Sequence, residues 1–462
     1  MSMMSLHQAA QAMAGELIGA DAMIEGVSTD SRTIRAGELF VALRGDRFDG
    51  HQFVAAVRDA GCAAAVVDRA GRDELVSLGL PLIVVADTRL ALAALAAAWR
   101  ARFSIPVVAV TGSNGKTTTK EMIGAILCAA YGDHVLATAG NLNNDIGLPL
   151  TLLRLRDDHR AAVIEMGMNH PGEIASLAAI VRPDVAIVTN AQRAHLAGMG
   201  TVETIAAEKG AVYGALSAQG VAVINADDRW AGVWRSQAAG HRVMDFSLDG
   251  QAPVSGHCQT HGLETLVTIS AQGEEIRIRL AIPGAHNARN ALAAAATGLA
   301  AGVPLAAVRE GLERFAGVKG RLQRCVGVHG ATLLDDTYNA NPDSVRAGID
   351  VLAATIGRKI LVLGDMGEIG DMTGQFHDEI GGYAKSQGID RLFALGESSA
   401  VAAYNFGQGG EHFKSVEDLA ARLSSEMTPE TTVLIKGSRF MRMERVVDAV
   451  LADGETKAGE SH

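Results

Sequence analysis

The chain has 462 residues, of which 48% are hydrophobic and 20% are charged, and its formal net charge is −11. This composition is typical of a globular protein, and the length leaves room for roughly three domains of about 150 residues each. The negative charge disfavours nucleic acid and acidic membrane surfaces as partners, and an aromatic content of 4% argues against a surface that stacks single-stranded bases.

The sequence contains no pattern of a disulfide framework or of a targeting segment. The cysteines lie far apart and form no C-x-x-C pair, so we expect Cys62, Cys128, Cys258 and Cys325 to be small core residues in a reducing compartment. Residues 1–16 lack the basic and apolar regions of a signal peptide, and the alanine- and leucine-rich stretches are too short to span a bilayer. We therefore predict a cytoplasmic location without membrane insertion.

The first segment, up to about residue 103, alternates strand and helix patterns. Strands are predicted at 38–43, 63–67 and 82–85, and helices at 51–60 and 90–100. The loops 28–32 and 44–51 are rich in arginine, hydroxyl groups and glycine. Such groups can hold a sugar-linked phosphate, because arginine forks and hydroxyls bind several oxygens at once. Either loop alone is better explained as a solvated turn, and the two together leave both interpretations open.

The strongest motif begins the second segment, residues 104–317. The β-branched run 107–110 predicts a strand, residues 111–115 a glycine loop, and the spacing of apolar residues from Met122 to Leu127 a helix. Such a loop directs backbone N–H groups at a phosphate, and the helix N-terminus adds a positive dipole. Lys116 is predicted to neutralise the outer phosphates and the Thr117 hydroxyl to bind magnesium. An ordinary turn with one exposed lysine explains the order of these features less well.

The glycine loop departs from the full phosphate-loop pattern at one position. Its sequence is Thr-Gly-x-x-Gly-Lys-Thr from Thr111 to Thr117, without the glycine that the full pattern separates from Gly115 by four residues. We interpret it as a shortened phosphate loop of an ATP-using subclass.

Polar side chains follow two further predicted strands of this segment. Glu165 comes directly after the run 161–164, and His195 follows the run 185–189. Ligands bind at the carboxyl ends of parallel strands, so we expect both side chains to converge with Thr117. A carboxylate, an imidazole and a hydroxyl suit magnesium that already carries phosphate oxygens and water. Each residue alone would more often be structural, but their shared position relative to the phosphate loop favours the metal site.

Two more features of the second segment are predicted from local pattern alone. Lys209 lies on a predicted helix beside Glu208, and this pattern is that of a surface lysine. A long alanine-rich helix is predicted to begin near Asn287, because asparagine is a favoured N-cap.

The third segment, residues 318–462, repeats the alternation of strands and helices. Apolar runs at 332–334, 360–363, 392–395 and 433–435 each end in glycine or polar residues and are followed by helical patterns, which predicts a second parallel sheet with crossover helices. Its loops would close over ATP and exclude water. The polar tail 452–462 is predicted to be disordered.

The chain as a whole resembles the Mur ligases, the ATP-dependent enzymes that build the cytoplasmic peptidoglycan precursor. Segment 111–118 is similar to the family's phosphate loop, including the absent glycine, 140–147 to its Gly-Asn-x-Asn-Asn segment, and 283–290 to its His-Asn-x-x-Asn segment. Segments 165–169 and 336–342 resemble those of members that add D-alanyl-D-alanine to UDP-N-acetylmuramoyl-tripeptide. The Tyr-Ala-His-x-Pro and Asp-Asn-Pro-Arg motifs of the sibling that adds the third amino acid are absent.

The resemblance implies a monomer of the α/β class with three domains. These would be a small α/β domain for the UDP-sugar at 1–103, a central P-loop domain with a parallel sheet for ATP at 104–317, and a Rossmann-like domain for the incoming dipeptide at 318–462. It also implies the reaction: ATP phosphorylates the tripeptide carboxylate, and the dipeptide amine displaces phosphate from this acyl phosphate.

The resemblance further implies site residues, position by position. ATP would be bound by Gly112, Asn114, Gly115, Lys116, Thr117, Thr118, Asn290 (adenine), Arg321 (phosphate) and Asp336 (ribose). Substrates would be bound by Ser31, Arg32, Asn141, Asn143, Asn144, Tyr338, Asn339 and Asn341. Two Mg²⁺ ions would be bound by Thr117, Glu165, His195 and a carbamoylated Lys209, and catalysis would depend on Lys116, Lys209, His195 and Arg321.

Two alternative functions fit parts of the sequence. A sibling Mur ligase or a folylpolyglutamate-synthetase-like amide ligase would share the phosphate loop, but 336–342 argues against both. A P-loop switch or motor would turn over ATP without an amino-acid substrate, and it leaves the N-terminal loops unexplained. The sequence leaves open whether the third residue of the tripeptide is diaminopimelate or lysine.

Overall fold

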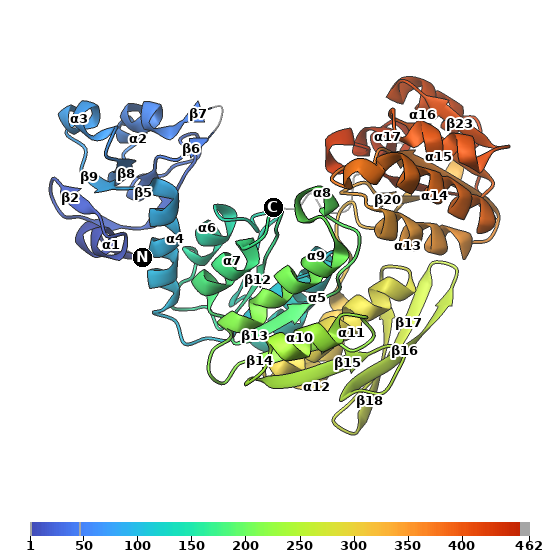
Figure 1. Ribbon diagram of the computed structural model, residues 1–462, viewed down its shortest axis with the longest axis horizontal. Coiled ribbons are helices and arrows are strands. Elements are labelled where there is room, and N and C mark those ends of the chain that lie inside the picture. The colour runs from blue at the N-terminus through green and yellow to red at the C-terminus, as the bar shows by residue number, and fades with distance from the viewer. Residues whose placement is uncertain (1, 46–47, 453–462) are drawn as a thin grey trace.

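The computed structural model describes residues 2–45 and 48–452, and Figure 1 shows three bodies in chain order. The large sheets lie within residues 16–85, 107–280 and 323–436, one in each body. The central body lies between the other two and carries the phosphate loop. The predicted α/β class with three bodies is confirmed, while the predicted domain limits at 103/104 and 317/318 stay predictions.

The first body is a five-stranded sheet with the strand order β2-β9-β8-β5-β4, in which all strands except β2 run parallel. Its elements are β1 Met4–Ser5, α1 Leu6–Ala12, β2 Glu16–Ile18, β3 Met23–Ile24, β4 Gly26–Ser28, β5 Glu38–Val41, β6 Arg44–Gly45, β7 Phe48–Asp49, α2 Val54–Asp59, β8 Ala64–Asp68, α3 Arg72–Leu75, β9 Leu82–Val85 and α4 Thr88–Arg100. Helix α4 packs against the central body, where Trp99 Nε1 donates a hydrogen bond to Leu155 O at 3.2 Å. Asp46 and Arg47, in the predicted binding loop 44–51, lie outside the described residues.

The central body is a nine-stranded sheet with the order β11-β12-β10-β13-β14-β15-β16-β17-β18, which is parallel from β11 to β16 and antiparallel beyond. Its elements are β10 Val107–Thr111, α5 Lys116–Tyr131, β11 Val135–Ala137, α6 Gly147–Leu152, β12 Ala161–Glu165, α7 Glu173–Val181, β13 Val185–Val188, α8 Leu196–Met199, α9 Val202–Gly210, β14 Val221–Asn225, α10 Ala231–Gln237, β15 Arg242–Ser247, β16 Val254–His261, β17 Glu264–Ala271, β18 Glu274–Leu280, α11 Ala285–Ala300 and α12 Leu305–Arg314.

Strand β10 is apolar throughout because it is buried on both faces. Val107 and Ala109 pack into the core under α4, α6 and α7, and Val108 and Val110 pack into the core under α5, α11 and α12. Parallel strands covered by helices on both sides have such continuous apolar runs. The strand therefore holds the phosphate loop at the centre of the sheet, between β12 and β13.

Helix α11 begins at Ala285 with Gly284 as its N-cap, so the predicted start near Asn287 was wrong by two residues. The Asn287 side chain does not cap the helix, because its Nδ2 donates to Pro283 O at 2.7 Å and its Oδ1 accepts from Asn290 Nδ2 at 3.1 Å. The Gly284 N–H is instead bound by Thr265 Oγ1 at 2.9 Å.

The third body is a six-stranded sheet with the order β19-β20-β24-β21-β22-β23. The predicted parallel sheet with crossover helices is confirmed for five strands, and β19 is antiparallel to β20 at the edge. Its elements are β19 Gln323–Val326, β20 Thr332–Asp336, α13 Pro342–Ala353, β21 Arg358–Gly364, α14 Thr373–Ser386, β22 Arg391–Leu395, α15 Ser399–Phe406, β23 Gly410–Phe413, α16 Val416–Ser424, β24 Thr431–Lys436 and α17 Glu444–Val450. The tail 452–462 was predicted to be disordered, and all of its residues except Ala452 lie outside the described residues.

All four cysteines are free thiols, and their environments differ. Cys62 and Cys325 are buried and Cys258 is half-buried, but Cys128 is exposed on α5, so the expectation of a core residue was wrong there. Across residues 2–45 and 48–452, no helix combines the length and the apolar character that crossing a membrane requires.

The packing of α12 on α5 generates a prediction. A Cβ on Gly311 would lie 2.5 Å from Ile126 Cα and 2.6 Å from Ile126 N, so the backbones of the two helices meet there. Gly311→Ala should destabilise the protein by about 1–3 kcal/mol through overpacking, and it should displace the helix that begins with Lys116. We expect a lower thermal unfolding midpoint.

Gly232→Ala is the matched control, because Gly232 also lies in a helix but a Cβ there would meet nothing within 4 Å. That variant should be neutral or slightly more stable, since alanine favours a helix over glycine. Equal midpoints for the two variants would contradict the proposed backbone contact.

Candidate functional site

The phosphate loop requires glycine at two positions. Gly112 has φ +149° and Gly115 has φ +79°, conformations that residues with a Cβ rarely adopt. A Cβ on Gly112 would clash with Thr189 Oγ1, and one on Gly115 would clash with Asn290 Oδ1. The loop therefore lies directly against Thr189, which follows β13, and Asn290 in the second turn of α11.

Residues that follow β13 hold the loop in shape. The Asn114 N–H donates to Asn190 Oδ1 at 2.9 Å, and Asn114 O accepts from Thr189 Oγ1 at 2.7 Å and from Asn190 Nδ2 at 2.9 Å. Ser113 Oγ donates to Gln192 O at 3.1 Å. Sequence reasoning missed Thr189 and Gln192, although their place after a strand adjacent to β10 could have indicated them.

Two cations lie at the start of α5. Lys116 Nζ donates to Gly112 O at 2.7 Å and to Ser113 O at 3.2 Å. Burial lowers the pKa of Lys116 to about 8, and the charge of Glu165 acts in the opposite direction. Arg321, from the third segment, donates from its Nη2 to Thr117 Oγ1 at 3.2 Å, and its Cζ lies 4.2 Å from the centre of the Tyr338 ring. Lys116, Thr117 and Arg321 thus meet as predicted for phosphate binding.

Glu165 ends β12 as a buried carboxylate that is 2% exposed. Its Oε1 accepts a hydrogen bond from Asn143 Nδ2 at 2.7 Å, and its backbone N–H donates to Thr138 Oγ1 at 2.9 Å. Within the described residues, Glu165 Oε2 has no hydrogen-bond partner. A buried oxygen without a donor is costly, so this atom fits a cation ligand.

Lys209 is fully buried, so the local pattern of a surface lysine was wrong. Helix α10 covers this side of α9, where Trp234 Nε1 donates to Ala206 O at 2.9 Å. Lys209 Nζ has no hydrogen-bond partner in the part of the chain that the structure describes. Burial lowers the pKa of Lys209 well below its ordinary value, and the charge of Lys116 adds to this effect. The site therefore disfavours a lysine cation.

His195 lies between the central and third bodies with φ +57°. Its Nδ1 is 2.9 Å from Glu368 Oε2, without the alignment of a hydrogen bond. The contact with His195 lowers the pKa of Glu368. Sequence reasoning missed Glu368, which follows the end of β21.

One cleft of about 1030 Å³ brings most of the predicted site residues together. Its walls come from α4, the phosphate loop, the ends of β12 and β13, and the loops after β20, β21 and β24. The predicted residues that line it are Asn114, Gly115, Lys116, Thr117, Asn141, Asn143, Asn144, Glu165, His195, Arg321, Tyr338, Asn339 and Asn341. Thr117, Glu165 and His195 thus converge as predicted from the strand ends.

Seven predicted residues are not among those that line this cleft: Ser31, Arg32, Gly112, Thr118, Lys209, Asn290 and Asp336. The Arg32 side chain is 86% exposed and pairs with Asp30 at 2.7 Å. Lys209 is buried outside the lining. In the described portion of the chain, no three His, Cys, Asp or Glu side chains form a metal-binding group, so phosphate oxygens and water would have to complete the ligands of a magnesium ion.

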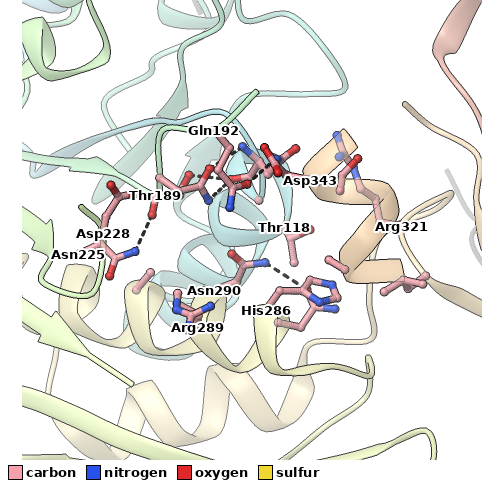
Figure 2. A pocket seen from close by; sticks show the side chains of 18 of the residues that line it. Thr118, Thr189, Gln192, Asn225, Asp228, His286, Arg289, Asn290, Arg321 and Asp343 are labelled. Atoms are coloured by element: carbon pink, nitrogen blue, oxygen red, sulfur yellow. Dashed lines mark hydrogen bonds between the residues drawn. The ribbon is translucent and has the colours of Figure 1, made fainter. Parts of the chain in front are cut away.

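A second cavity, of about 330 Å³, lies on the other side of the phosphate loop. Figure 2 shows Thr118, Asn225, Asn290 and Arg321 around it, with the hydrogen bond from Asn225 Nδ2 to Thr189 O. The predicted nucleotide residues Asn290 and Asp336 both line this cavity, and so does His286, whose pKa burial lowers to about 4.

Asp336 is already engaged in this cavity. Its Oδ2 accepts from Lys436 Nζ at 2.6 Å, and its Oδ1 accepts from the Leu322 N–H at 3.2 Å. Sequence reasoning missed this pairing, although Lys436 ends β24, the neighbour of β20. The predicted contact of Asp336 with a ribose stays a prediction.

Asn341 and Arg193 make further polar contacts between the central and third bodies beside the phosphate loop. Asn341, the N-cap of α13, donates from Nδ2 to Asn114 Oδ1 at 2.7 Å. Arg193, two residues before His195, donates from Nη2 to Asp343 Oδ1 at 2.7 Å and from Nη1 to Glu379 Oε2 at 2.8 Å. Arg193 was not predicted, because nothing in the local sequence indicates partners on α13 and α14.

The site geometry can be compared with known proteins. Three family models match the chain: the Mur ligase family catalytic domain at 23–100, the Mur ligase middle domain at 110–298, and the Mur ligase glutamate ligase domain at 320–439. The UDP-N-acetylmuramoyl-tripeptide–D-alanyl-D-alanine ligase of Escherichia coli strain K12 is 40% identical over 457 residues, which cover 97% of this chain and 99% of the relative.

Solved structures are similar over nearly the same length. One is UDP-N-acetylmuramoylalanyl-D-glutamyl-2,6-diaminopimelate–D-alanyl-D-alanyl ligase from Acinetobacter baumannii, with a TM-score of 0.86, 36% identity and coverage of 96% of this chain and 97% of that one. Another is MurF ligase from Thermotoga maritima in complex with ADP, with a TM-score of 0.79, 26% identity and coverage of 92% and 96%.

The contacts of Arg193 generate a prediction with a pH dependence. The hydrogen bond from Arg193 is the main cause that lowers the pKa of Glu379 below its ordinary 4.5. Its stabilising contribution is therefore complete above pH 4.5 and lost as the pH falls through the lowered value. Arg193→Ala should cost about 1.5–3 kcal/mol at pH 7, as expected for hydrogen bonds to charged groups.

Thermal unfolding from pH 8 to pH 4 measures this effect. The midpoint difference between wild type and Arg193→Ala should shrink as the pH approaches 4, and Arg193→Lys should lie between them because it keeps the charge and loses the fork. A difference that does not change with pH would count against the ion pair.

Proposed function

The chain belongs to the Mur ligase family, and we propose that it joins D-alanyl-D-alanine to UDP-N-acetylmuramoyl-tripeptide, with conversion of ATP to ADP and phosphate, in peptidoglycan precursor synthesis. The observation that carries this proposal is the 40% sequence identity, over nearly the full length of both chains, to a ligase with this name. The geometry agrees with it, because one cleft joins a phosphate loop to the segment 338–341 of the third body.

The chemistry explains why ATP is needed. A carboxylate is a poor electrophile, because an amine cannot expel oxide from it. Transfer of the γ-phosphoryl group to the terminal carboxylate of the tripeptide gives an acyl phosphate and ADP. The neutral amine of the dipeptide then attacks the acyl carbon, and the C–O bond breaks to release inorganic phosphate and leave an amide.

Residues of this chain would assist mainly by position and charge. Phosphoryl transfer depends largely on positioning and on neutralisation of charge. The loop from Gly112 to Gly115 is already held by the segment after β13, so little reorganisation is required. Lys116 would exchange the carbonyl oxygens of Gly112 and Ser113 for phosphate oxygens, and Arg321 would approach from the opposite body.

The donor atoms in the cleft suit magnesium. Glu165 Oε2 is buried without a described partner, and the Thr117 hydroxyl and the His195 imidazole line the same cleft. These groups would hold one or two ions together with phosphate oxygens and water. Magnesium bound there would neutralise phosphate charge and orient the transferred group.

We propose that Lys209 carries a carbamate. Its Nζ is buried and has no partner among the described residues, which favours the neutral amine, the form that reacts with carbon dioxide. Carbamoylation would replace an unfavourable cation beside Lys116 with an anion. Such an anion could bind Lys116 or a metal ion directly or through water.

The proposal extends to the substrates, the oligomeric state and the location of the protein. The first body would bind the UDP-sugar through Ser31 and Arg32, and the third would bind the dipeptide. The third residue of the tripeptide would be diaminopimelate, as in the name of the Acinetobacter baumannii ligase, which is 36% identical. The protein would act as a monomer in the cytoplasm, where its nucleotide substrates are made.

Phosphate release tests the function. With ATP and UDP-N-acetylmuramoyl-tripeptide present, addition of D-alanyl-D-alanine should increase phosphate release and form an amide product that mass spectrometry detects. The diaminopimelate tripeptide should be used better than the lysine tripeptide. Release that is indifferent to the dipeptide would refute the ligase and favour a motor or switch.

The carbamate generates a second prediction. Lys209→Ala should reduce kcat by at least about 100-fold, the loss expected when one electrostatic group is removed from a catalytic site. Short carboxylic acids should restore part of the activity, because they can occupy the space of the carbamate.

A readout that does not depend on activity is available. In ¹³C-bicarbonate buffer, wild type should show a carbamate resonance that Lys209→Ala lacks. Full activity of the variant, or equal spectra for the two proteins, would exclude the modification.

A further inference from the structure

The incoming dipeptide carries a charge that the site described so far does not accommodate. This point rests on the proposed function, in which the amine of D-alanyl-D-alanine reacts near the phosphate loop. An extended dipeptide spans about 7 Å, so its carboxylate lies well away from the reacting carbon. The carboxylate therefore needs a cation other than those that hold the transferred phosphate.

The cleft has seven basic side chains that could serve. They are Arg89, Lys116, His170, His195, Arg321, Lys436 and Arg439. Lys116 and Arg321 meet at the phosphate loop, where they contact Gly112 and Thr117. A carboxylate at that place would compete with the γ-phosphoryl group, so these two cations are unsuitable.

Two further members are committed to partners in the protein. Lys436 is 3% exposed, and its Nζ donates to Asp336 Oδ2 at 2.6 Å and to Asn339 O at 2.9 Å. Release of Lys436 would leave the buried Asp336 carboxylate without its cation, which is costly. His195 contacts Glu368 and faces the proposed metal site.

Arg89 and His170 lie on the wall of the cleft that is opposite the third body. Arg89 lies on α4 and pairs with Asp145. His170 precedes α7, and its backbone N–H donates to Glu173 Oε2 at 3.1 Å. This wall is built from the first and central segments. Under the proposed function it faces the UDP-linked substrate and not the dipeptide.

Arg439 remains, and its surroundings suit a carboxylate. It follows β24 in the third body, its side chain is 64% exposed, and its Nη1 donates to Glu444 Oε1 at 3.0 Å. That contact leaves Nη2 and Nε available, and the planar guanidinium can bind a carboxylate with two parallel hydrogen bonds.

The backbone that carries Arg439 is held in place. Ser438 Oγ donates to Ala340 O at 3.0 Å and accepts from the Gly367 N–H at 2.8 Å. These bonds tie the residue before Arg439 to the loops after β20 and β21, which line the same cleft. The Arg439 backbone is thus held in place, and among the described residues its guanidinium is bonded by Glu444 alone, through Nη1.

We propose that Arg439 binds the terminal carboxylate of the incoming dipeptide and makes the enzyme selective for a free C-terminus. Hydrogen bonds to a charged group are worth a factor of about 10 to 100 in affinity, after conversion of their usual free energy. An amidated dipeptide lacks the negative charge, so it should lose about this factor.

The test compares D-alanyl-D-alanine with D-alanyl-D-alaninamide in phosphate-release assays. Wild type should prefer the acid by about 10- to 100-fold in kcat/KM. Arg439→Gln should raise KM for the acid by about that factor and abolish the preference, without a change in KM for ATP. Arg439→Lys should be intermediate, because it keeps the charge and loses the fork.

Arg442→Gln is the matched control, because Arg442 is an exposed arginine three residues on that does not line the cleft. It should retain the wild-type preference. An Arg439→Gln enzyme that still prefers the acid, or that loses acid and amide turnover equally, would overturn the assignment. A wild-type enzyme that uses neither dipeptide would instead refute the proposed function, and the assignment with it.

Discussion

The close approach of the phosphate loop to its two neighbours is the constraint on which the rest of the site depends. Gly112 and Gly115 allow the loop to touch Thr189 and Asn290, where any side chain at the glycines would collide. This contact fixes the N-terminus of α5 and therefore Lys116 and Thr117. It also separates the two cavities, because the loop forms part of the wall of each.

The site is divided between bodies that meet through polar contacts. Asn114 bonds Asn341, Thr117 bonds Arg321, and His195 contacts Glu368. Hydrogen bonds and ion pairs of this kind exchange readily with water and ligands, whereas a large apolar interface would not. All the residues that make these contacts, except Arg321, follow a strand of the central or the third sheet. The arrangement therefore combines a tightly held phosphate loop with polar contacts to the third body beside it.

Rules about strand ends explain what the sequence could predict. Glu165 is the last residue of one buried parallel strand and the phosphate loop follows another, so topology alone places them at one edge of the sheet. The same rule could have indicated Lys436. Burial of Lys209 depends on how α10 packs over α9, and the partners of Arg193 lie 150 and 186 residues away. Such tertiary contacts leave no trace in a local pattern. Asn287 was predicted as the N-cap from the general propensity of asparagine for that position. Its side chain instead donates a hydrogen bond to Pro283 O, a contact that a propensity does not reveal.

The balance of charge in the cleft explains why its chemistry requires added cations. The lining contains five arginines and lysines and five aspartates and glutamates, so its formal charge is zero although the whole chain carries −11. The cleft is thus less acidic than the rest of the protein but not basic enough to offset the phosphates of ATP. Several of its cations are also paired, as in Lys436 with Asp336. Glu165 Oε2, which has no hydrogen-bond partner within 2–45 and 48–452, adds negative charge where the phosphates would lie, and this is favourable only if a metal ion separates the two.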